Sequence, residues 1–183
     1  MSFSSWPFRV FVALFALGGV IWLGASVARM VVGFDVFVPG TLVFKPTQSE
    51  SVRLHTIWLF TLLGGWTGWS FLTCTVGGVG TAILVRRSFK THGWLLMSAI
   101  LLVLLIPVQA YVAWEDYQLW TFFDRTTGMP FAQPAEIIGV FLHRYTNTAV
   151  NVMLGMSLFA ALTIILFCTI RPLQKPLTDS TAS

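Results

Sequence analysis

Four long apolar runs, separated by shorter polar segments, dominate the chain. Each run is long enough to cross a hydrocarbon core of roughly 30 Å as a helix. A continuous helix from Ala135 to Ile170 would be about 54 Å long, too long for one crossing. We therefore expect a short interfacial helix, Ala135–Leu142, that bends into the last run. The pattern predicts an all-α integral membrane protein with one membrane domain, a four-transmembrane-helix bundle with a short outer interfacial helix before helix 4. The expected spans are residues 10–32, 54–85, 93–114 and 145–170.

The polar residues that flank these runs predict the helix ends. Ser49–Ser51 offers an N-cap region before the second helix. Residues 33–53 form a loop whose β-prone residues either pair as a short hairpin or lie against the bilayer. The third helix ends at Trp114, because Glu115 and Asp116 follow at once and are expected outside the hydrocarbon. Residues 172–183 form a polar tail that we expect to be disordered.

Composition supports a lipid-facing surface. The chain is 56% hydrophobic and only 10% charged, whereas a soluble domain carries roughly 25% charged residues. The net charge of +4 is scattered, with no patch suited to nucleic acid. Cys74 and Cys168 lie in apolar runs without metal or redox spacing, and we interpret them as small buried residues. Arg29, near the end of the first run, is expected to snorkel to the headgroups.

The loop between the second and third spans sets the expected orientation. It carries Arg86, Arg87 and Lys90 within five residues, and short loops rich in Lys and Arg tend to stay in the cytoplasm. The total number of basic residues does not decide the orientation, because six fall on one side and five on the other. The local density of basic residues therefore decides it. We expect a cell inner-membrane protein with both termini cytoplasmic. The five basic residues expected outside are Arg29, Lys45, Arg53, Arg125 and Arg144.

Small residues form a stripe along the second helix. At 100° per residue they fall on one face, and two of them form a G-x-x-x-G step that lets helix backbones approach closely in lipid. Packing inside the bundle and contact with another subunit explain the stripe equally well. Its members are Gly64, Gly68, Thr75, Gly78 and Ala82.

A second polar pattern precedes the fourth span. His143, Asn147 and Asn151 share one helix face, and polar side chains within a span usually face the bundle interior or a partner. His55 begins the second span, so His55 and His143 are expected on the same side of the membrane. Two facing imidazoles are able to ligate one haem b iron. Interfacial histidines and asparagines that bond helix to helix are the simpler interpretation.

Catalytic patterns do not emerge from the sequence. There is no H-E-x-x-H, G-x-S-x-G or phosphate-loop motif, and no metal-spaced cluster. With Glu115 and Asp116 placed outside the third helix, no span holds an acidic residue, which disfavours a proton relay or an ion-coupled carrier. We therefore expect no catalytic residue and no enzyme activity of the chain itself.

Two segments resemble known families. Residues 50–64, with Glu50, Arg53, Trp58 and Gly64, are similar to the second helix of the small membrane subunit of TRAP transporters, and Arg29 matches an arginine that closes that family's first helix. The resemblance implies four spans, cytoplasmic termini and a transport role. The first loop and second helix are each about ten residues longer here. Residues 53–56 also resemble the start of a haem-bearing helix in haem–copper oxidase subunits.

The expected function is that of a non-catalytic membrane subunit of a larger inner-membrane complex. Its expected partners are the lipid bilayer and other membrane protein subunits. The first alternative is an electron-transport anchor that binds haem b through His55 and His143. The second is the small subunit of a TRAP-type transporter. Size, the glycine stripe and the missing catalytic acids favour the subunit interpretation.

Overall fold

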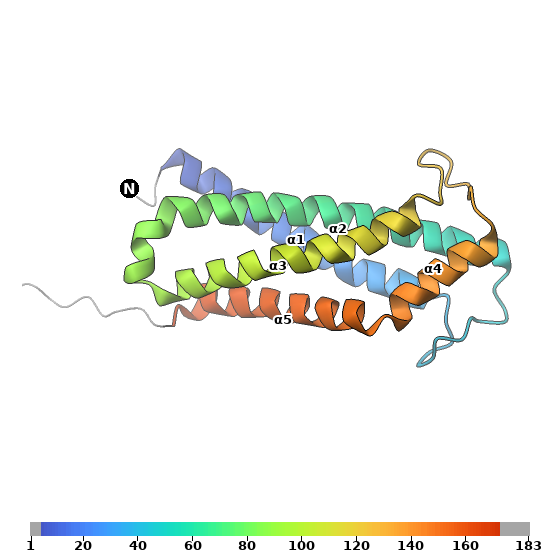
Figure 1. The fold of residues 1–183 in the computed structure, drawn as a ribbon. Coiled ribbons are helices and arrows are strands. Elements are labelled where there is room, and N and C mark those ends of the chain that lie inside the picture. Colours follow the sequence, from blue (N-terminus) through green and yellow to red (C-terminus); the bar gives the residue numbers. More distant parts are fainter. Residues whose placement is uncertain (1–4, 173–183) are drawn as a thin grey trace, which may run out of the picture.

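The computed structural model describes residues 5–172 as an all-helical bundle (Figure 1). The expected disordered tail lies, apart from its first residue, outside the described residues. Four helices are long and apolar enough to cross a membrane, which indicates a multi-pass membrane protein. The elements are α1 (Trp6–Phe34), α2 (Glu50–Val85), the short 3₁₀ helix η1 (Arg86–Lys90), α3 (Gly93–Trp120), α4 (Pro134–Thr146) and α5 (Thr148–Ile170).

α1 and α2 form the most extensive contact in the bundle, an antiparallel pair. Their backbones touch at two glycines. A Cβ at Gly77 would collide with the backbone of Phe11 and Phe15, and one at Gly18 would lie 2.5 Å from the backbone nitrogen of Cys74. Only glycine permits such close approach, so these two positions fix how α1 lies along α2.

α2 is longer than a bilayer crossing and extends past α1 at one end. It begins at Ser49, whose hydroxyl accepts a hydrogen bond from the backbone N–H of Val52, as the N-cap pattern predicts. Its 36 residues span about 54 Å. Arg29 lies beside Gly64, so the first fourteen residues of α2 lie beyond the level of that arginine. This end of the molecule, which also contains both long loops and α4, is called the cap end here (Figure 1).

α3 runs to Trp120, six residues farther than the sequence predicts. Its last turns contain Glu115 and Asp116, which we had placed outside the helix. Asp116 is buried against other helices, and this tertiary contact allows the helix to continue. Near the middle of α3, Gln109 donates a hydrogen bond of 2.8 Å to the hydroxyl of Ser157 in α5, so a polar side chain of the third span joins two helices.

A break at Asn147 separates α4 from α5, and it confirms the predicted bend before the fourth span. The side-chain oxygen of Asn147 accepts hydrogen bonds from the backbone N–H groups of Ala149 and Val150, which caps α5. The amide of Asn151 donates to the carbonyl of Tyr145, 2.7 Å away. These two asparagines thus satisfy backbone groups that the break leaves without helical partners.

The cap end contains the larger of two buried hydrophobic clusters, which we call the aromatic cap core. The first loop contributes to it through a turn closed by an antiparallel bridge between Phe37 and Phe44, as in the hairpin alternative. The loop after α3 closes in the same way between Phe123 and Pro130. Both loops therefore fold back onto the helices. The buried members are Val36, Phe37, Ile57, Phe60, Leu119, Phe123, Ile137 and Phe141.

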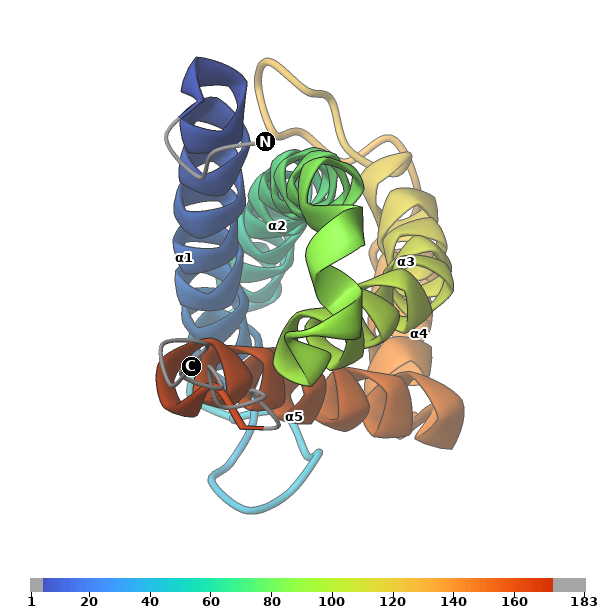
Figure 2. The ribbon, with the colours of Figure 1, turned by 90° about the vertical axis from the view of Figure 1, so that its left-hand side faces the viewer.

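The opposite end contains η1, the start of α1 and the end of α5, and is called the basic end here. Arg86, Arg87 and Lys90 are exposed there. The helices form two pairs, α1 with α2 and α3 with α5, and α2 packs on α3 between them. Seen from the basic end, the first turns of α1 and the last turns of α5 lie apart (Figure 2).

Candidate functional site

Three places in the bundle could carry function: a buried charge cluster at the cap end, a pocket at the basic end, and an exposed face of α2. The charge cluster consists of Arg29 in α1, Asp116 in α3 and Arg144 in α4. One carboxylate oxygen of Asp116 binds Arg29 Nη1 and the other binds Arg144 Nε, each at 2.5 Å. The three side chains are 6–11% exposed. One carboxylate therefore ties three helices together.

The surroundings of the cluster favour a structural role. The Arg29 guanidinium lies 4.0 Å from the ring centre of Phe60, and that of Arg144 lies 5.2 Å from the same ring, at cation–π distance. Gly64 leaves the space for Arg29, since a Cβ there would lie 3.1 Å from Nη2. Burial raises the pKa of Tyr145, beside the cluster, to about 12, so the phenol remains neutral near pH 7. The charge cluster and the aromatic rings around it therefore hold α1, α3 and α4 in position.

Sequence analysis missed this cluster. The sequence predicted Asp116 outside the third helix and the charged head of Arg29 among the lipid headgroups. In the structure, Arg29 is only 6% exposed and its guanidinium binds Asp116 within the protein. A partial signal was present, because Arg29, Asp116 and Arg144 all stand near the ends of apolar runs that the topology brings to the same side of the membrane. The pairing itself joins residues 87 and 28 positions apart, and no local pattern reports such a contact.

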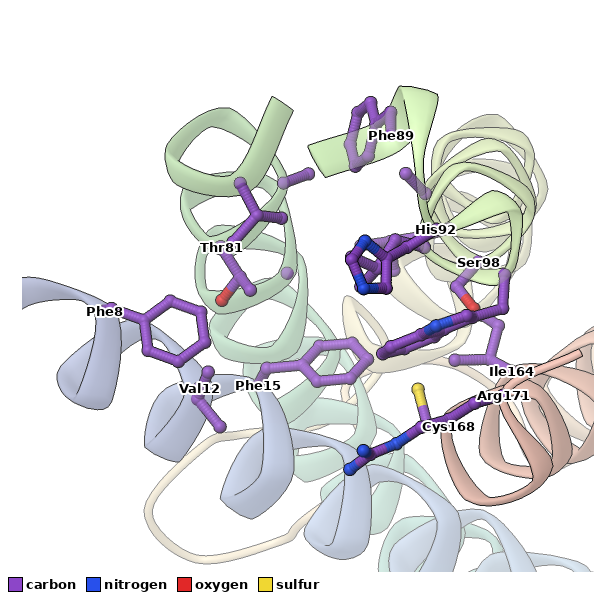
Figure 3. Close-up of a pocket in the computed structure, with 17 residues that line it drawn as sticks. Phe8, Val12, Phe15, Thr81, Phe89, His92, Ser98, Ile164, Cys168 and Arg171 are labelled. Atoms are coloured by element: carbon purple, nitrogen blue, oxygen red, sulfur yellow. The ribbon is translucent and has the colours of Figure 1, made fainter. Parts of the chain in front are cut away.

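The pocket at the basic end has a volume of about 490 Å³ and lies among α1, α2, α3 and α5 (Figure 3). Its wall is mostly apolar, with Phe15 and Leu102 deep in the bundle and Phe89 of η1 at the basic loop. Polar groups of the wall come from α2, from the start of α3 and from the end of α5, namely Thr81, His92, Trp94, Ser98, Cys168 and Arg171. Its size is that of a small-molecule site, in the range of roughly 300–1,000 Å³.

The predicted small-residue stripe divides between these places. Gly64 faces the charge cluster, and Gly78 packs against Leu102 and Phe15. Ala82 lines the pocket, and Thr75 is half-buried. Gly68 is exposed, and a Cβ there would meet no atom within 4 Å. The G-x-x-x-G step therefore makes no close helix contact at Gly68 in the described part of the chain.

The exposed face of α2 surrounds Gly68. Gly65 has the same open space, and the side chains of Trp66 and Trp69 are 67% and 69% exposed. Trp69 lies five residues from Gly64 toward the basic end, so it is about 7.5 Å deeper in the bundle than the charge cluster. Two large aromatic rings beside two open glycines thus form an exposed surface on the outside of a long apolar helix.

The predicted polar residues have local roles. His55 and His143 are exposed at the cap end, and the ring of His55 packs beside Trp58 at 5.3 Å between ring centres. Asn147 caps α5 as described above. Asn151 is exposed rather than directed into the interior, because its amide serves the backbone of the α4–α5 break. Cys74 is buried as expected, whereas Cys168 is exposed.

No family model matches the sequence, and comparison with curated proteins and with solved structures gave no match. Function is therefore inferred from the charge cluster, the pocket at the basic end and the exposed face of α2.

Proposed function

We propose that the chain is a non-catalytic integral membrane subunit that binds a second membrane subunit through the exposed face of α2, on a membrane whose cytoplasmic side contacts the basic end. The observation that carries the proposal is the open glycine surface at Gly65 and Gly68 beside Trp66 and Trp69. Glycine in a helix interior costs about 1 kcal/mol relative to alanine. The buried glycines of α1 and α2 all lie where a backbone or a large side chain approaches, namely Gly18, Gly33, Gly64, Gly77 and Gly78. Exposed glycines elsewhere, such as Gly155, are as open as Gly65 and Gly68, and the two exposed tryptophans distinguish the face of α2 from them. Small residues let two helix backbones approach closely in lipid. Because no helix of this chain packs on this surface, it suits a helix of another subunit.

The depth of Trp69 supports the same role. Tryptophan at the membrane interface directs its indole N–H to water or headgroups. Trp69 lies below the level of the charge cluster, where lipid tails offer no acceptor, and an unpaired polar group in hydrocarbon costs several kcal/mol. A partner helix supplies both a packing surface for the ring and an acceptor for the N–H.

The test compares two identical substitutions on exposed helix faces. Gly68→Leu adds bulk on the proposed contact face, and Gly155→Leu adds the same bulk on α5, where a Cβ also meets nothing within 4 Å. Native membranes carrying each variant are solubilised gently and run on a native gel. We expect wild type and Gly155→Leu in a complex larger than the monomer. We expect Gly68→Leu as a monomer, because a clash at a close backbone contact costs about 1–3 kcal/mol.

Two outcomes contradict the proposal. In one, the wild-type chain is monomeric in gently solubilised native membranes. In the other, Gly68→Leu migrates with the wild-type complex. Insertion and folding of the variant are checked separately by its thermal unfolding in detergent, which should match that of wild type because the added side chain meets no atom of its own chain.

A further inference from the structure

The pocket at the basic end lies between two helix pairs. Its wall combines residues of α1 and α2 with residues of α3 and α5. α1 packs on α2 and α3 packs on α5, but α1 and α5 make no extensive contact in the described part of the chain. Seen from the basic end, the first turns of α1 and the last turns of α5 lie apart (Figure 2), and in a membrane lipid chains surround such a bundle.

Two polar groups on the α3 wall lack ordinary hydrogen-bond partners. The indole N–H of Trp94 and the hydroxyl of Ser98 are buried, and neither makes a hydrogen bond of normal geometry. Only the Cys168 thiol, a weak partner, interacts with Ser98. Buried donors without acceptors are uncommon in native proteins. Both residues line the pocket, so these are donors without strong partners in its wall.

Arg171 places a positive charge over the same pocket. Its side chain reaches from the end of α5 across the pocket (Figure 3), with its guanidinium carbon 5.9 Å from the ring centre of Trp94. Its backbone is left-handed, with φ 53° and ψ 51°, and no other non-glycine residue of the described part has positive φ. Glycine or asparagine usually occupies this position after a helix. This left-handed conformation ends α5 at Arg171, so its side chain leaves the helix at the pocket.

Among the described residues, the charge at this end of the molecule is of one sign. Arg86, Arg87 and Lys90 stand close to the pocket on η1, whose Phe89 lines it. The six acidic residues of the described part all lie at the cap end, namely Asp35, Glu50, Glu115, Asp116, Asp124 and Glu136. The pocket mouth therefore attracts anions, and its interior favours hydrocarbon.

We propose that this pocket binds an anionic membrane lipid, with one acyl chain between the helix pairs and the headgroup phosphate against Arg171. A soluble anion would leave the apolar wall without a partner, and a neutral lipid would leave Arg171 unused. The ester or phosphate oxygens of the lipid are acceptors that suit Trp94 and Ser98. Basic pockets between transmembrane helices are known sites for anionic headgroups.

The test titrates delipidated protein, in an uncharged detergent, with phosphatidylglycerol and with phosphatidylcholine of the same acyl chains, and counts bound lipid by native mass spectrometry. We expect phosphatidylglycerol to bind about tenfold more tightly, as one charge-assisted contact would give. Arg171→Gln should abolish that preference. Arg87→Gln removes the same charge from an exposed residue outside the pocket wall and should retain it.

A second pair of variants tests the acyl-chain site. Ala99→Phe from α3 and Ala82→Phe from α2 fill the pocket from opposite walls without changing charge, so each should weaken binding of both lipids at least about tenfold. Thermal unfolding identifies any variant that fails to fold, and the other then carries the test.

Three results would overturn the proposal. The first is equal binding of the two lipids by wild type. The second is equal loss of preference in Arg171→Gln and Arg87→Gln, which would show general surface attraction. The third is displacement of phosphatidylglycerol by inorganic phosphate at constant ionic strength, which would show a site for a soluble anion.

Discussion

At the cap end, two loops and α4 close over the helices, and eight buried hydrophobic residues surround the helix ends. At the basic end, the helices diverge around a pocket, and the second hydrophobic cluster has only three buried members, Leu102, Leu105 and Ile164. Charge follows the same division. The cap end buries Asp116 between two arginines, whereas the basic end exposes Arg86, Arg87 and Lys90 on η1.

In this small bundle, the residues that stabilise the fold and the residues that line the pocket lie at opposite ends. Buried area and paired charges hold α1, α3 and α4 at the cap end, so the helix ends on the other side do not all need to touch. A region with few buried contacts is the one that is free to admit a ligand. The cap end is therefore expected to dominate the free energy of unfolding, and the basic end to dominate ligand affinity.

The largest expected effect is from Asp116→Ala. It leaves two buried arginines without their carboxylate, and removing one partner of a buried ion pair typically costs about 3–5 kcal/mol. Thermal unfolding in mild detergent should show a large loss of Tm. The triple variant Arg29→Met, Asp116→Leu, Arg144→Met removes the whole cluster and should recover most of it. An unchanged Tm in Asp116→Ala would show that the cluster does not hold the cap end.

The next effect compares one substitution at both ends. Phe141 is fully buried in the aromatic cap core, so Phe141→Ala should lower the free energy of unfolding by about 3–5 kcal/mol. Phe89 is half-buried on the pocket wall, so Phe89→Ala should cost about 1 kcal/mol, because less of its ring leaves water or lipid on folding. Denaturant unfolding of both variants measures the difference. Equal losses would contradict the division between the two ends.

The smallest effect is pH-dependent and concerns the edge of the cap end. Lys45 donates a hydrogen bond of 2.8 Å to Asp35, and this contact lowers the pKa of Asp35 below its ordinary value. A lowered folded pKa contributes stability above the unfolded pKa, about 3.9, and that stability is lost as pH falls through the folded value. Between pH 7 and 3, wild type should lose slightly more Tm than Asp35→Asn. Because the pair is exposed, a large difference between them would contradict this assignment.

The helical elements follow from local features of the sequence. Hydrophobic run length predicts four long helices, and the excess length before the last one predicts the break that Asn147 makes. Ser49 marks the start of α2 through its own hydroxyl. Such features can be predicted from the sequence, because helix formation and capping depend on neighbours within a few residues.

Tertiary structure decided the site. Asp116 appeared to end a helix, yet α3 continues through it because arginines from α1 and α4 neutralise it. Gly64 and Gly68 look alike in sequence, but one gives space to Arg29 and the other faces outward. The pocket lies among residues of α1, α2, α3 and α5 that are far apart in the sequence. Burial, charge pairing and cavity shape depend on which distant segments meet, and hydrophobic periodicity specifies a face of a helix without specifying its neighbour.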